Sequence, residues 1–169
     1  MTTTPSPATT SRAFLDARLE QMRLVKEEVT AAPSQFAKEP VQVQIRAETS
    51  SGFTLGLNDL KTPKNLTIEI SYKVVLKLQD SEKQLVAYEA GHQLQFGVSG
   101  WTGFDNWQDP PHKALAPYTA IAQCLAMKRA QETLGAMGFG GIILPKPQFP
   151  ELEGTAEVIQ SNAPAQATH

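Results

Sequence analysis

Two long runs in which apolar and polar residues alternate constrain this chain more than any other feature of its sequence. The even positions of residues 66–78 and 86–98 are mostly apolar or aromatic, and the odd positions are mostly polar. A period of two residues is typical of a β-strand with one buried face. Residues 80–83 form a short polar segment between the runs, so the sequence predicts an antiparallel hairpin. The apolar faces are Leu66, Ile68, Ile70, Tyr72, Val74, Leu76, Leu78, and Val86, Tyr88, Ala90, His92, Leu94, Phe96, Val98.

A further strand and one helix are predicted around this hairpin. Apolar and polar residues also alternate over residues 41–48. Pro117 suits the first turn of a helix, and apolar residues follow it at helical spacing. Ala122, Ala126 and Ala130 keep one helix face small enough for close packing, and Gly135 begins the expected helix end. Residues 12–32 fit a helix by propensity, although part of this segment also alternates.

Composition limits the class of protein. The 169 residues fit one domain, which we place at residues 12–150 between flexible tails at 1–11 and 151–169. The net charge of −2 gives no field that favours nucleic acid. The single cysteine, Cys124, excludes a disulfide framework and a multi-cysteine zinc site. The first residues lack the pattern of a secretory signal, and no apolar run is long enough to cross a bilayer, so we expect a cytoplasmic protein.

Three stretches resemble the SecB export chaperone family. Residues 74–96 are similar to its central hairpin, with Glu89 seven positions before Phe96, and residues 115–118 carry a Pro-Tyr pair at the helix start. Residues 137–149 resemble its Gly-Phe, Leu-Pro and aromatic segment, and residues 24–45 are a weaker match. The resemblance implies an α+β fold in which a four-stranded antiparallel sheet carries one long helix on one face. It also implies that residues 22–30 are a strand, and that sheet edges and helices pair into a homo-dimer or homo-tetramer.

The function implied by this resemblance is that of a holdase, a chaperone that binds unfolded client polypeptides without ATP, cofactor, metal or catalysis. Exposed apolar side chains would hold the client, and strand edges would pair with its backbone. Each candidate client-binding residue is equally compatible with an ordinary core position. Glu89 is the candidate partner-binding residue, for the translocation motor SecA. The client-binding candidates are Phe36, Phe53, Phe139, Ile142, Leu144 and Phe149.

The sequence also departs from the family pattern. Pro150 and Gly154 interrupt the region of its second helix, and residues 51–63 have the appearance of an insertion between strands. Ala87 replaces a leucine of the surface that resembles the SecA contact, which favours a dedicated client such as an antitoxin over export. A structural or assembly oligomer and a small-ligand-binding α+β protein are the alternatives. His92 is expected to be a core histidine with its hydrogen bonds satisfied, and Cys124 is expected to be buried and inert.

Overall fold

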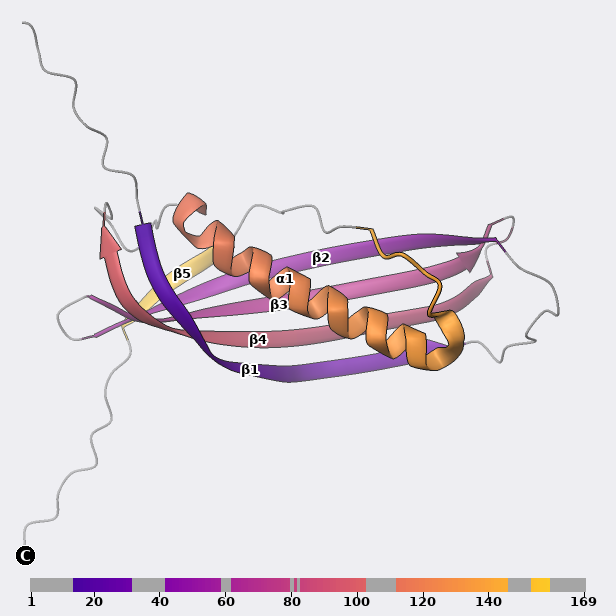
Figure 1. Cartoon of the computed structure of the whole chain (residues 1–169), viewed down its shortest axis with the longest axis horizontal. Helices are drawn as coiled ribbons and strands as arrows, with labels where there is room; N and C mark the ends of the chain where they lie inside the picture. The colour runs from indigo at the N-terminus through magenta and orange to yellow at the C-terminus, as the bar shows by residue number, and fades with distance from the viewer. Residues whose placement is uncertain are drawn as a thin grey trace, which may run out of the picture.

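The chain forms one curved sheet with a long helix on one face. The computed structural model describes residues 14–31, 42–58, 62–79, 81, 83–102, 112–145 and 153–158. Figure 1 shows the helix running along the sheet, with β1 at one edge. The elements in chain order are β1 (Phe14–Ala31), β2 (Val43–Leu57), β3 (Pro63–Leu78), β4 (Gln84–Thr102), α1 (His112–Leu134), the π-helical turn η1 (Gly135–Phe139) and β5 (Glu153–Val158).

The strands are ordered β1-β4-β3-β2-β5, and the first four are antiparallel to their neighbours. The predicted hairpin is confirmed, because β3 pairs with β4 in a register that places Tyr72 opposite Ala90 and Val74 opposite Tyr88. The predicted α+β arrangement of four antiparallel strands with one long helix on one face is therefore present. A fifth strand, β5, extends the sheet by pairing in parallel with β2.

Two sequence-based expectations about strands are wrong. Residues 14–21, for which propensity favoured a helix, belong to β1, because the whole segment pairs with β4 and this long-range pairing overrides local preference. Most of residues 51–63 is not an insertion, because β2 continues to Leu57 and β3 begins at Pro63. Phe53, Leu55 and Leu57 continue the buried face of β2. In addition, residues 153–158 form β5 within the segment expected to be a tail.

The core lies between the helix and one face of the sheet, which we call the covered face. The even positions of β3 and β4 fill it, as the alternation predicts. From the helix, Ala122, Ala126 and Ala130 are fully buried, so α1 packs closely through small side chains, as expected. Gly138 follows in the left-handed region, with a φ of 95° that suits a glycine at a helix end. Cys124 is exposed on α1, which corrects the expectation of a buried thiol: the buried alanines occupy other positions of the helical repeat.

Candidate functional site

Tyr118 joins the beginning of α1 to the beginning of β1. Its hydroxyl donates a hydrogen bond to the carbonyl oxygen of Leu15 at 2.7 Å and accepts one from the backbone N–H of Ala17 at 2.9 Å. Its ring packs edge-on against Phe96 of β4, with the ring centroids 5.2 Å apart. The helix and the edge strand are thus tied by two hydrogen bonds, both to backbone atoms.

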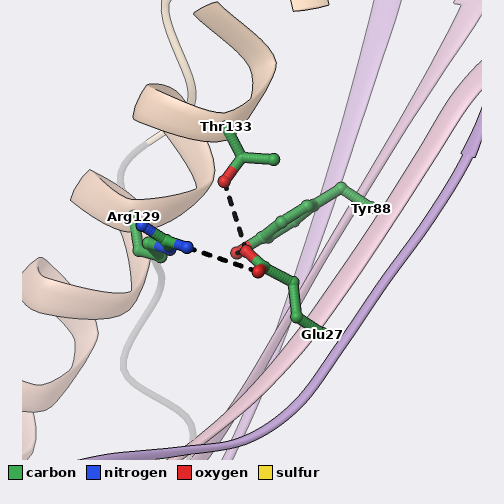
Figure 2. Close-up of polar contacts among 4 residues, drawn as sticks. All are labelled: Glu27, Tyr88, Arg129 and Thr133. Atoms are coloured by element: carbon green, nitrogen blue, oxygen red, sulfur yellow. Dashed lines mark hydrogen bonds and ion pairs between the residues drawn. The ribbon is translucent and has the colours of Figure 1, made fainter. Parts of the chain in front are cut away.

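Glu27 makes the corresponding connection near the other end of the helix. Figure 2 shows its carboxylate beside Arg129 and Thr133 of α1 and Tyr88 of β4. Arg129 Nη2 lies 3.4 Å from one carboxylate oxygen, and the hydroxyls of Thr133 and Tyr88 each donate to the other at 3.2 Å. Burial acts to raise the pKa of Glu27, but the bonds from Arg129, Thr133 and Tyr88 outweigh it and lower that pKa. Burial, followed by the charge and hydrogen bond of Glu27, raises the pKa of Tyr88 to about 12.

Between these two connections lies a band of half-exposed apolar side chains. Residues of β1 that pair with covered-face residues of β4 share that face, since directly paired residues of antiparallel strands point the same way. Leu19, Met22 and Leu24 pair with Phe96, Leu94 and His92 and therefore lie on the covered side, yet each is 38–43% exposed. On α1, Ile121 and Leu125 lie on the same side as Tyr118 and Arg129 at helical spacing. We call Leu19, Met22, Leu24, Ile121 and Leu125 the β1–α1 surface.

Polar side chains are buried beneath the middle of the helix. Tyr72 and His92 are diagonal neighbours on β3 and β4, and Gln123 is buried on α1; none is more than 3% exposed. The hydroxyl of Tyr72, Nδ1 of His92 and both amide atoms of Gln123 have no protein hydrogen-bond partner among the described residues. Burial lowers the pKa of His92, against the opposing charge of Glu27, so the ring is neutral near pH 7. His92 is buried as predicted, but Nδ1 lacks, among the described residues, the protein hydrogen-bond partner expected of a satisfied core histidine.

The opposite face of the sheet, which α1 does not cover, is polar. A hollow of about 1030 Å³ crosses it, with Ser50, Ser71 and Gly91 in register on three neighbouring strands. Gln93 Nε2 donates to Glu69 Oε1 at 3.1 Å beside this row. Within the part of the chain that the structure describes, no cluster of side chains suits a metal ion. No described helix is long and apolar enough to cross a membrane.

The structure scatters the residues that the resemblance suggested as a client site. Phe53 and Leu144 belong to the buried core, whereas Phe139 and Ile142 are half-buried and pack against it. Phe36 and Phe149 lie outside the described residues.

Glu89 points to the uncovered face, where its carboxylate accepts a hydrogen bond from Lys26 Nζ at 3.3 Å. The β1–α1 surface was not predicted from the sequence, because helix propensity favoured a helix for the segment that contains Leu19, Met22 and Leu24.

The chain was also compared with known proteins. No family model matches it, and no curated protein matches its sequence. The solved structures that match the chain include the following two. One is the Mycobacterium tuberculosis Rv1957 SecB-like chaperone in complex with a ChAD peptide from the Rv1956 HigA1 antitoxin, at 12% identity over 80% of this chain and 91% of that chain, with a TM-score of 0.48. The other is a protein of unknown function from Streptococcus agalactiae, at 14% identity over 80% and 98% of the two chains, with a TM-score of 0.36.

Proposed function

We propose that this protein is an ATP-independent holdase that binds unfolded polypeptides at the β1–α1 surface. The observation that carries the proposal is the band of half-exposed apolar side chains beside the outer edge of β1, which has no strand partner among the described residues. When a partner covers exposed apolar surface, the free energy of the complex falls by about 25 cal/mol for each Å² that is buried. An adjacent strand edge offers backbone hydrogen bonds to an extended partner, whatever its sequence. Together these features suit a binder of unfolded chains better than a catalyst.

The resemblance to the SecB family supports the finer parts of the proposal. We place the protein in the cytoplasm as a homo-dimer or homo-tetramer. Its clients are either precursors passed to SecA, with Glu89 as the docking residue, or a dedicated partner such as an antitoxin. Phe139 and Ile142 extend the client surface near the end of α1. Phe36 and Phe149 are client contacts from the flanking segments, while Phe53 and Leu144 support this region from the core.

The proposal is tested by light scattering of a chemically unfolded protein diluted into buffer with and without this chain. We expect the wild type to suppress aggregation at near-stoichiometric amounts without ATP. Leu24→Ser and Met22→Ser should weaken suppression, because each removes apolar surface that the client covers. Val25→Ser is the matched control: Val25 is 65% exposed on the same strand, at a bulge beside the hollow of the uncovered face. A folded protein that leaves aggregation unchanged would refute the proposal.

A further inference from the structure

The covered face buries His92 of β4 between the two places where α1 is tied to the sheet. Along β4, His92 lies four residues from Phe96, which contacts Tyr118, and four residues from Tyr88, which donates a hydrogen bond to Glu27. The ring is 3% exposed, and its Nδ1 has no protein hydrogen-bond partner among the described residues. Buried polar atoms that lack a protein partner weaken packing. The middle of α1 is therefore held less firmly than an apolar contact would hold it.

Two charged side chains act on His92 from the elements packed around it. Burial has the largest effect and disfavours the protonated ring; Glu27 of β1 favours it, and Arg129 of α1 disfavours it. Tyr72 of β3 and Tyr88 of β4 stay uncharged at neutral and acid pH, because burial raises the pKa of both. Glu27 and Arg129 form an ion pair at 3.4 Å (Figure 2). A proton on His92 would therefore attract one member of this pair and repel the other.

The two connections of α1 differ in how they respond to such a proton. At the Tyr118 end, the hydrogen bonds are 2.7 and 2.9 Å long, join backbone atoms of β1 and involve no charged group. At the Glu27 end, the bonds are 3.2 to 3.4 Å long and all depend on one carboxylate. A positive charge on His92 acts directly on this second connection. The Glu27 end is therefore where the helix and the sheet separate first.

We propose that protonation of His92 releases the second half of α1 from the sheet and so enlarges the apolar surface that the holdase offers to clients. The helix pivots about Tyr118, and its inner face separates from its own sheet. Contacts that another copy makes with the outer face of α1 or with the sheet edges are kept. This inference rests on the proposed holdase function and adds its regulation by acid. The side chains uncovered at the Glu27 end are paired in register and at most 1% exposed in the closed state: Val74, Leu76, Val86 and Tyr88.

The direction of the pH effect follows from the surroundings of His92 in the two states. In the closed state, burial holds the pKa of the ring below its ordinary value of 6.5, whereas water restores that value in the open state. The open state therefore binds the proton more readily, and its population rises as the pH falls below about 6.5. One proton changes the ratio of open to closed molecules by up to about tenfold per pH unit. Glu27 stays charged in this range, because its folded pKa lies below 4.5.

Hydroxyl-radical footprinting of the full chain without any client, read by mass spectrometry at pH 7.5 and 5.5, tests the opening. Oxidation of Leu76 and Tyr88 should be up to about tenfold faster at the lower pH. Oxidation of Leu66, which is buried as fully but pairs with Phe96 at the Tyr118 end, should not change. His92→Gln keeps a polar, uncharged side chain and should abolish the acid response. The matched control, His169→Gln, removes a histidine from the last position of the sequence and should retain the response.

A second variant keeps His92 in place. Gln123→Leu replaces a buried amide that has no protein partner in the described part of the chain, so it should favour the closed state. Oxidation of Leu76 and Tyr88 should then fall about fivefold at both pH values, with an unchanged ratio between them. An unchanged wild type, an acid response that survives in His92→Gln, or an equal increase at Leu66, which indicates global unfolding, overturns the proposal.

The regulation itself is read from suppression of aggregation by the same proteins. The wild type should suppress aggregation more strongly at pH 5.5 than at pH 7.5, and His92→Gln should suppress it equally at both. Equal suppression by the wild type at the two pH values overturns the regulation. Because footprinting uses no client, a chain that opens in acid but never suppresses aggregation refutes the holdase proposal and leaves the opening established.

Discussion

Replacement of Tyr118 by phenylalanine tests whether α1 is held to the edge strand by the hydrogen bonds described above. The substitution keeps the ring and its edge-on packing against Phe96 but removes the hydroxyl. Two bonds are lost, and the backbone groups of Leu15 and Ala17 lose their partner. A buried hydrogen bond contributes about 1 kcal/mol, and an unsatisfied buried group adds to the loss, so we expect about 2–3 kcal/mol of destabilisation. For a chain of this size, that lowers the Tm by roughly 4–12 °C.

Tyr72→Phe is the matched control, because it deletes the same atom from a tyrosine that is buried on the same face of the sheet. The hydroxyl of Tyr72 has no protein hydrogen-bond partner among the described residues, so its loss should change the free energy of unfolding by less than about 0.5 kcal/mol or raise it. Urea denaturation followed by circular dichroism measures both variants. Equal destabilisation by the two substitutions would refute the reasoning. Hydrogen exchange adds a local check: Tyr118→Phe should accelerate exchange of the Ala17 amide.

Three other predictions follow from the same contacts. In the wild type, Glu27 contributes fully to stability above its unfolded pKa of about 4.5, and this contribution is lost as the pH falls through its lower folded pKa. Glu27→Gln should therefore make the free energy of unfolding, measured in urea between pH 3 and 7, fall less steeply toward acid pH than in the wild type. Gln123→Leu should raise the free energy of unfolding by about 1 kcal/mol, since neither amide atom has a protein partner among the described residues, and a loss of similar size would contradict this. Gly97→Ala should destabilise the protein by less than about 1 kcal/mol, because the new methyl displaces only the flexible end of Glu20, and Glu20→Ala should remove that cost in a double-mutant cycle.

The parts of the fold that follow from local periodicity were predictable from the sequence. Buried and more exposed residues alternate along most of β3 and β4 because one face is buried under α1 and the other meets water, and a slip of one residue would exchange those faces. The end of α1 near Gly138 follows from the backbone geometry of glycine, whereas α1 begins at His112, so Pro117 lies inside the helix and not in its first turn as expected. These features depend on neighbouring residues alone.

β1 was not predictable in this way, because its conformation depends on pairing with β4, which is distant in the sequence: Ala31 pairs with Val86 and Phe14 with Thr102. Three bulges break its alternation, so its apolar residues have neither a regular strand period nor a regular helix period. Glutamate and lysine add helix propensity to the same segment, and local reasoning then favours the wrong element. The β1–α1 surface was missed for the same reason: Leu19, Met22 and Leu24 reach the covered side only through pairing with β4.

The way in which α1 is attached explains why the neighbouring apolar side chains stay exposed. A helix with leucine or phenylalanine on its inner face would stand further from the sheet, whereas alanines at positions 122, 126 and 130 bring it close over β3 and β4. The narrow helix then leaves the covered side of β1 in contact with water, and the hydrogen bonds of Tyr118 and Glu27 tie it to that strand near its two ends. Larger residues at the alanine positions would cover more of β1 but would also displace the helix. The small side chains on the inner face of α1 therefore explain why Leu19, Met22 and Leu24 remain exposed.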